Sequence, residues 1–289
     1  MSLNRSRIRT TLGAAVACVA AATVGVLAPG SASAAAVGVL APGSASAAAV
    51  ALPPVHAGFD YQIGGAYTPP AGVKVVSRDH SASPASGLYN ICYVNAFQTQ
   101  AAGDPGGPED WNRDLLLKDG NGNVIIDPDW DEAILDITTD AKRQSIANKI
   151  KVQIDECAAK GFNALELDNF DTYTREVVGG RITASHAQSY IRLLSSYGHG
   201  KGLAVGQKNT VELAPNHAAN GLDFAIAEEC GAWNECSRYL SAFGDHAIFI
   251  EYKDAGMKKA CQYGDRVSVV QRDVNVSPAG SSGYVRKTC

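Results

Sequence analysis

Several short apolar runs of this sequence end in carboxylates or other polar side chains, at points where strand-like segments end. They are Tyr93 and Asn95, Glu166, Asp168 and Asn169, Lys208 and Asn209, Glu228 and Glu229, and Glu251 and Tyr252. Two carboxylates at one open site suit the cleavage of a glycosidic bond, because one protonates the leaving oxygen while the other stays ionised. A lysine beside them would favour the ionised form of one carboxylate, whereas crowding of carboxylates raises the pKa of another.

Side-chain alternation along a strand predicts which of these residues share a face. Leu165 and Leu167 occupy one face of their strand, which leaves Glu166 and Asp168 on the other. Small residues alternate with larger ones before Lys208, which places the lysine on the same inner side. Glu166 lies deeper than Asp168, so we expect it to orient other groups rather than to react.

The same alternation gives a specific prediction for the two adjacent glutamates. The large side chains of Phe224 and Ile226 are expected to face outward, so that Glu229 faces the site and Glu228 points away. The predicted mouth therefore contains Tyr93, Asp168, Lys208, Glu229 and Glu251.

The elements that must position these residues alternate between strand and helix from residue 58 onward. The strand-like runs are Phe59–Ile63, Val73–Ser77, Tyr89–Asn95, Ile134–Ile137, Ala164–Asp168, Leu203–Lys208, Phe224–Glu228, Ala247–Tyr252 and Val267–Gln271. Apolar stripes predict helices over Thr139–Lys160 and Thr183–Gly198. The alternation predicts an α/β fold, a single (β/α)8 TIM barrel with its active site at the carboxyl ends of the strands. Nine runs exceed eight strands by one, so one run is auxiliary or misassigned.

The first 50 residues have the features of an export signal and its tail. Three arginines precede an apolar run of small residues, Ala32–Ala34 forms an A-x-A cleavage site, and Gly25–Val37 is repeated at Gly38–Val50. We therefore expect a leader over residues 1–50, a secreted catalytic domain over 51–289, and no membrane span in the mature chain. Without the three leader arginines, 22 basic side chains oppose 29 acidic ones, a net charge of −7 that disfavours a nucleic-acid partner.

Six cysteines follow the leader, and an even number in an exported chain predicts three disulfides. Alternation and helical spacing predict Cys92–Cys157, which would join a helix to the barrel wall. The other predicted pairs are Cys230–Cys236, which closes a short loop, and Cys261–Cys289, which fixes the C-terminus.

Other kinds of chemistry lack their sequence patterns. Beyond the leader there is no G-x-S-x-G elbow, no phosphate-binding loop and no dinucleotide fingerprint after a strand. The cysteines and histidines lack zinc-ligand spacing. We therefore expect neither a metal nor a cofactor.

Six ordered blocks of the sequence resemble glycoside hydrolase family 114, the endo-α-1,4-polygalactosaminidases, over about residues 58 to 289. The blocks are Asp60–Ile63 (DYQI), Asn90–Asn95 (NICYVN), Gly161–Tyr173 (GFNALELDNFDTY), Gly206–Asn209 (GQKN), Ala227–Cys230 (AEEC) and Ile250–Tyr252 (IEY). The resemblance implies a TIM barrel that cleaves α-1,4-linked galactosamine polymers. It implies catalytic acids among Asp168, Glu228, Glu229 and Glu251, and leaves the choice within the adjacent pair open.

The substrate implied by this resemblance is a cationic polysaccharide, because galactosamine carries an ammonium group near neutral pH. Clustered carboxylates around one lysine fit such a substrate. The residues expected to contact it are Asp60, Tyr93, Asn95, Glu166, Asn169, Lys208, Asn209 and Tyr252. Two alternatives remain open from the sequence: a hydrolase of another amino-sugar or neutral α-glycan, and a secreted carbohydrate-binding barrel without turnover.

Overall fold

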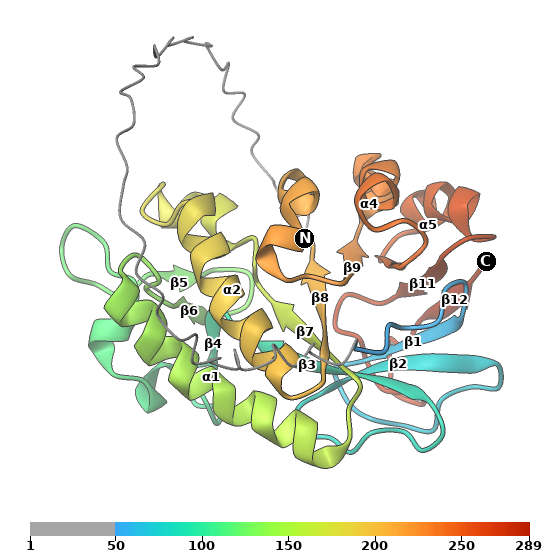
Figure 1. The fold of residues 1–289 in the computed structure, drawn as a ribbon, viewed down its shortest axis with the longest axis horizontal. Helices are drawn as coiled ribbons and strands as arrows, with labels where there is room; N and C mark the ends of the chain where they lie inside the picture. The colour runs from blue at the N-terminus through green and yellow to red at the C-terminus, as the bar shows by residue number, and fades with distance from the viewer. Residues whose placement is uncertain (1–49) are drawn as a thin grey trace, which may run out of the picture. The chain divides into compact units, whose positions relative to one another are not determined.

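Eight parallel strands curl around a common interior in the computed structural model, which describes residues 50–289 (Figure 1). The predicted leader, apart from Val50, lies outside the described residues. The strands are β1 (Gly58–Gln62), β2 (Val73–Asp79), β3 (Tyr89–Asn95), β7 (Ala164–Asp168), β8 (Ala204–Lys208), β9 (Phe224–Glu228), β10 (Ala247–Glu251) and β11 (Ser268–Arg272), with β12 (Arg286–Thr288) antiparallel to β11. The predicted α/β barrel class is confirmed.

The ninth strand-like run of the sequence, Ile134–Ile137, does not belong to the barrel. The chain between β3 and the first long helix forms a separate antiparallel sheet in the order β4–β6–β5, which we call the inserted sheet. Its strands are β4 (Gln98–Ala101), β5 (Ile126–Asp127) and β6 (Glu132–Ile134). The predicted run overlaps only the last residue of β6, and Leu135 to Ile137 are buried without belonging to a strand.

Two long helices begin and end at residues suited to those positions. The Thr139 side chain accepts a hydrogen bond from Lys142 N at the start of α1 (Asp140–Lys160), and Gly161 ends the helix with a left-handed φ of 87°. Thr183 and His186 form a reciprocal capping box at the start of α2 (Ala184–Gly200). Both predicted helices are therefore present within two residues of their expected bounds.

Shorter helices follow the later strands and fill the loops. The α-helices are α3 (Cys230–Trp233), α4 (Cys236–Phe243) and α5 (Asp254–Ala260). The 3-10 helices are η1 (Pro108–Asp110), η2 (Arg113–Leu115), η3 (Thr172–Thr174), η4 (Glu176–Val178), η5 (Val211–Asn216), η6 (Ala218–Asn220) and η7 (Cys261–Tyr263). None of the helices in residues 50–289 is long and apolar enough to cross a bilayer.

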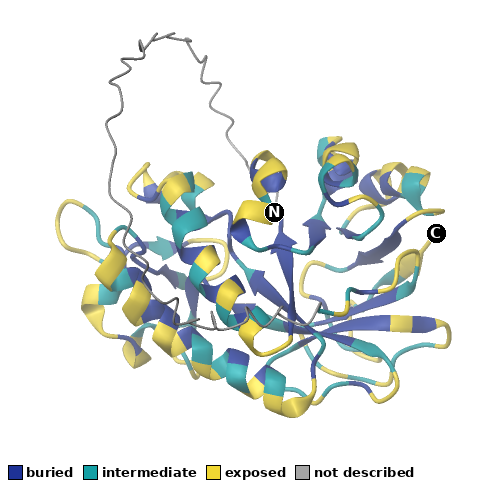
Figure 2. Cartoon of the chain, in the orientation of Figure 1, coloured by how far each residue is buried: buried dark blue, intermediate teal, exposed yellow. Residues whose placement is uncertain are grey.

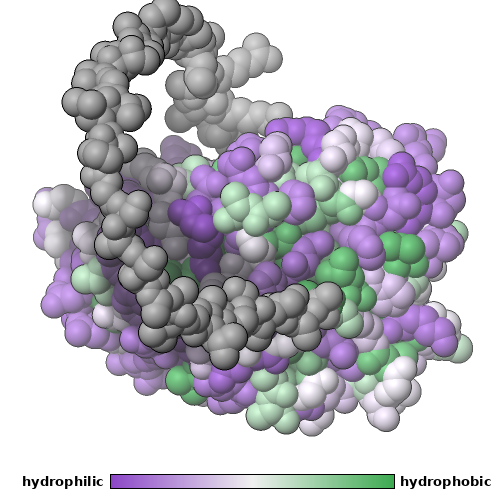
Figure 3. Space-filling view, viewed as in Figure 1, coloured by the Kyte–Doolittle hydropathy of each residue, from purple (hydrophilic) through white to green (hydrophobic). Residues whose placement is uncertain are grey.

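The barrel strands are buried on both faces and separate two hydrophobic cores (Figure 2). The outer core packs the sheet against the helices and includes Leu165, Leu167 and Phe249. The inner core fills the barrel and includes Phe59, Phe224 and Ile226. Large side chains therefore occupy the inside, as is usual for this kind of barrel. On the face visible in Figure 3, hydrophilic residues predominate and apolar residues occur in small groups.

The barrel closes between β1 and β11 through side chains. The backbone N of Ala57 donates to the Ser268 hydroxyl at 3.2 Å, and Arg286 of β12 donates to the carbonyl of Phe59 at 3.0 Å. Within the described part of the chain, no strand ladder joins β1 to β11. These contacts satisfy backbone groups that a ladder would otherwise pair.

The structure contains the three disulfides in the pairing expected from the sequence. Cys92–Cys157 joins β3 to α1, Cys230–Cys236 closes the loop between α3 and α4, and Cys261–Cys289 ties the end of the chain to η7. The first bond joins a strand to an outer helix, the second joins two short helices, and the third fixes the C-terminus. Each bond restricts the conformations of the unfolded chain and thereby stabilises the folded one.

Candidate active site

Three neighbouring strands end in the same way, and each end presents a charged side chain. Asp168, Lys208 and Glu228 are the last residues of β7, β8 and β9. The next residue in each case has a positive φ, between 50° and 63°; these residues are Asn169, Asn209 and Glu229. This left-handed conformation is one that asparagine adopts readily, and it turns the chain out of the sheet. The three charged side chains are therefore left at one edge of the barrel.

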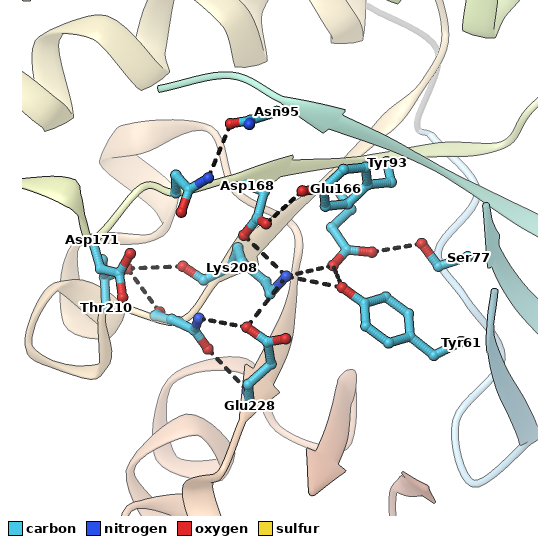
Figure 4. Close-up of polar contacts among 12 residues, drawn as sticks. Tyr61, Ser77, Tyr93, Asn95, Glu166, Asp168, Asp171, Lys208, Thr210 and Glu228 are labelled. Carbon is cyan, nitrogen blue, oxygen red and sulfur yellow. Dashed lines mark hydrogen bonds and ion pairs between the residues drawn. The ribbon is translucent and has the colours of Figure 1, made fainter. Parts of the chain in front are cut away.

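Lys208 lies at the centre of this edge (Figure 4). Its ammonium is 2.9 Å from Glu166 Oε1, 3.0 Å from Asp168 Oδ1 and 3.4 Å from Glu228 Oε2. The same nitrogen is 3.0 Å from the Tyr61 hydroxyl. The lysine side chain is only 1% exposed. These five residues form what we call the Lys208 cluster. Although burial opposes its charge, the surrounding carboxylates raise the pKa of Lys208 well above its ordinary value, so it stays protonated.

Asp168 is held in its ionised form. Burial disfavours the charge, but Lys208 and a hydrogen bond of 2.8 Å from the Tyr93 hydroxyl outweigh burial and hold the pKa of Asp168 below its usual value. Its side chain is 17% exposed, so it remains accessible from outside the barrel. An accessible, ionised carboxylate is what a nucleophile or a water-activating base requires.

Glu228 is the second accessible carboxylate of the cluster, with 21% of its side chain exposed. Asn209 contacts it twice, donating to Oε2 at 3.0 Å and accepting from its backbone N at 2.9 Å. The Tyr252 hydroxyl donates to the other carboxylate oxygen. Burial raises the pKa of Tyr252 well above its ordinary value, so this donor stays protonated. Glu228 is thereby oriented beside Asp168.

Glu166 lies two residues before Asp168 on β7, further inside the barrel, and is fully buried. It accepts hydrogen bonds from Tyr61 at 2.8 Å and Ser77 at 2.5 Å, besides its ion pair with Lys208. Burial raises its pKa despite the lysine. This placement agrees with the orienting role expected from the sequence. Tyr61 and Ser77 were missed, although each lies two residues after an apolar inner residue of its strand, Phe59 or Val75, and so shares its face.

The expectation that Glu229 faces the site is wrong in the structure, which places Glu228 there instead. Phe224 and Ile226 belong to the inner core, so alternation also directs Glu228 inward. Gly206 on the neighbouring strand makes room for the phenylalanine, since a Cβ there would lie 2.9 Å from the Phe224 ring. Glu229 has already left the strand and precedes α3.

Glu251 also lies outside the predicted mouth. It points to the outer side of β10, where it is fully buried, and its Oε1 accepts from Gly231 N at 2.6 Å. Burial raises the pKa of Glu251 to about 7. The sulfurs of Cys230 and Cys236 are close to this carboxylate, but their disulfide removes both as metal ligands. The alternation of β10 instead brings Tyr252 to the Lys208 cluster.

Asp60 is the third displaced candidate, because β1 directs Phe59 and Tyr61 into the barrel and Asp60 outward. It is fully buried where the barrel closes. Gln62 donates to it at 2.8 Å and Arg286 at 3.1 Å, and the Arg272 guanidinium is 3.8 Å away. These contacts make Asp60 part of the closure between β1 and β11 rather than a substrate contact.

A second polar group borders the cluster on the side of the inserted sheet. Asn95 is the register partner of Asp168, and it accepts a hydrogen bond from Asn169 at 2.9 Å. Arg175 donates to Asn169 at 2.7 Å and pairs with Asp127 at 3.1 Å. Sequence reasoning missed Arg175 and Asp127, because neither follows a predicted barrel strand. Their group extends the polar edge beyond Asp168.

Comparisons with known proteins agree with this arrangement. Residues 40–289 match the family model described as Glycoside-hydrolase family GH114. No protein of curated function matches the sequence. Among solved structures, Aspergillus fumigatus Ega3, in complex with galactosamine, superimposes with a TM-score of 0.67 at 19% identity, over 86% of this chain and 100% of that one. The glycoside hydrolase domain of PelA from Pseudomonas aeruginosa gives 0.52 at 15% identity, over 78% and 97%. These two likenesses show a shared fold.

Proposed function

Since the chain belongs to glycoside-hydrolase family GH114, we propose that it is an endo-acting hydrolase of α-1,4-linked galactosamine polymers, with Asp168 and Glu228 as its catalytic pair. One observation carries this assignment: these two accessible carboxylates share a single buried ammonium at the carboxyl ends of adjoining barrel strands. That edge is where barrel enzymes place their catalytic residues.

The two carboxylates take different roles in this proposal. Asp168, kept ionised by Lys208, attacks the anomeric carbon, while Glu228 donates a proton to the leaving glycosidic oxygen. The C–O bond to the leaving sugar breaks, and an ester between Asp168 and the remaining sugar forms. Glu228 then removes a proton from water, which attacks the same carbon and releases Asp168.

The proposed substrate carries an ammonium group on each sugar unit, and the edge around Asp168 and Glu228 is rich in carboxylates. The structural relative Ega3 was solved with galactosamine, which supports an amino sugar as the unit recognised here. Three disulfides and the predicted leader support action outside the cytoplasm. Within this proposal, residues 51–289 form the secreted catalytic domain.

Hydrolysis of a charged polymer is the direct test of substrate choice. We expect release of reducing ends from polygalactosamine, with kcat/KM at least tenfold lower on the fully N-acetylated polymer, because acetylation removes the ammonium groups. Raising salt from about 0.1 M to 1 M shortens the Debye length from about 10 Å to 3 Å, so KM for the charged polymer should rise.

Two outcomes would contradict this assignment. Equal rates on both polymers without salt dependence would favour a neutral-glycan hydrolase. Binding of polygalactosamine without release of reducing ends would favour a non-catalytic carbohydrate-binding barrel.

The spacing of the pair predicts the stereochemistry of the reaction. One nitrogen contacts both carboxylates, at 3.0 and 3.4 Å, so the two contacting oxygens are at most the sum of these distances, 6.4 Å, apart. Retaining glycosidases need carboxyl groups about 5 to 5.5 Å apart, whereas inverting enzymes need about 6.5 Å or more. We therefore expect the α-anomer to be released first, as observed by NMR early in the reaction. A β-anomer as the first product would require an inverting mechanism.

A further inference from the structure

Glu132 of the inserted sheet reaches the same polar edge from outside the barrel. Its strand β6 pairs with β4, which follows β3 after a two-residue connection. In the inserted sheet Glu132 is the register partner of Asp127, and its carboxyl group also lies near Asn95, the register partner of Asp168. Glu132 is half-buried, so the residue remains partly open to solvent. A carboxylate from a different sheet therefore borders the catalytic pair.

The charges around Glu132 are predominantly negative. Asp168 and Asp127 are near enough to raise the pKa of Glu132. The charge of Glu132 in turn contributes to the raised pKa of Tyr93 on β3. Arg175 is the nearby cation, but it already pairs with Asp127 at 3.1 Å. Among residues 50–289, no basic side chain lies within ion-pair distance of Glu132.

We infer that Glu132 is a specificity-determining residue, which binds the ammonium group of a galactosamine unit next to the scissile bond. This inference rests on the proposed function. The substrate supplies the cation that the protein does not place beside Glu132. An ammonium at this position would also offset the repulsion between Glu132 and Asp168, which an N-acetyl group cannot do.

The protonation state of Glu132 in the free protein predicts that substrate binding releases a proton, which can be measured. Burial raises the pKa of Glu132 to about 8, and the neighbouring Asp168 and Asp127 carboxylates act in the same direction, against the hydrogen bond from Asn95. At pH 7 the carboxyl group is therefore mostly protonated before substrate binds. An arriving ammonium favours the ionised form and lowers this pKa, so binding should release up to one proton from Glu132.

Glu132→Gln keeps the shape of the side chain and its ability to accept from Asn95 while removing the charge. We expect KM for polygalactosamine to rise about tenfold with kcat changed less than threefold, and little change for the N-acetylated polymer. Asp131→Asn is the matched control, because Asp131 is exposed and its left-handed φ of 57° suits asparagine. This control should leave both constants unchanged.

Proton release provides a second readout that loss of packing would not produce. A galactosamine oligosaccharide is titrated calorimetrically into Glu228→Gln at pH 7, in two buffers of different ionisation enthalpy, and the titration is repeated with Glu132→Gln added. The added substitution should remove up to one released proton per site. Unchanged KM and unchanged proton release in an enzyme that cleaves polygalactosamine would overturn the role of Glu132. Absence of cleavage by the unsubstituted protein would instead overturn the proposed function.

Discussion

Asp168→Asn and Glu228→Gln should each lower kcat on polygalactosamine by about 10³-fold or more, while the protein stays folded. Each change preserves shape but removes either the nucleophile or the transferable proton, and such groups typically contribute 10²- to 10⁴-fold. Both side chains are partly exposed and keep their size in these variants, so neither substitution should reduce the stability of the fold by much. Steady-state kinetics with a thermal melt of each variant provides the measurement.

Two further glutamates serve as controls, because the sequence places them among the candidate acids. Glu229→Gln and Glu251→Gln should keep kcat within about tenfold, since Glu229 follows the strand and Glu251 faces the outer helices. An inactive Glu229→Gln beside a fully active Glu228→Gln would refute the assignment made from the structure. It would also restore the orientation of Glu229 that was expected from the sequence.

The division of roles within the pair can be tested with the same variants. A substrate with a good leaving group needs no general acid in the first step, so its first-step rate should largely recover in Glu228→Gln. The same substrate should not rescue Asp168→Asn, because the attacking carboxylate is absent. Equal rescue of both variants would contradict the assigned roles.

The misplaced glutamate shows what residue patterns can and cannot predict here. Alternation correctly orients β7, because Leu165 and Leu167 belong to the outer core and Glu166 faces inward. At β9 the alternation holds, but the assumption that the large residues face outward is wrong, because large size does not distinguish an outward residue from one that fills the barrel interior. Phe224 is accommodated opposite Gly206, a contact between strands that a single-strand pattern does not contain.

The overall fold was more predictable than the site, because repeated alternation of strands and helices averages over local errors. The eight barrel strands, both long helices and the three disulfides were all expected. The inserted sheet was not, since its strands have two to four residues and carry no clear periodicity. Glu132 was missed for this reason, and Arg175 was missed because it follows a 3-10 helix rather than a predicted strand. Tertiary packing alone brings both residues to the polar edge beside Asp168.

Loss of the Lys208 charge should have the second-largest effect on activity, mainly by changing the protonation of Asp168. In Lys208→Met, three carboxylates lose their common cation, and burial and mutual repulsion then raise the pKa of Asp168. The nucleophile is protonated over a wider pH range. We expect kcat/KM near pH 6 to fall about 10²-fold or more, with the acidic limb of the pH profile shifted upward and part of the activity regained at higher pH.

The direction of this shift separates an electrostatic role of Lys208 from a purely structural one. Breaking a buried ion pair costs about 3 to 5 kcal/mol of stability, so the profile is also measured in Lys208→Met with Glu166→Gln, which removes the buried negative charge as well. Lys201→Met is the matched control, because Lys201 pairs with Asp155 on the outer helices and should not affect the profile. If folded Lys208→Met lost activity equally at every pH, the lysine would act by packing, and Asp168 would owe its ionisation to the Tyr93 hydroxyl and its backbone contacts instead.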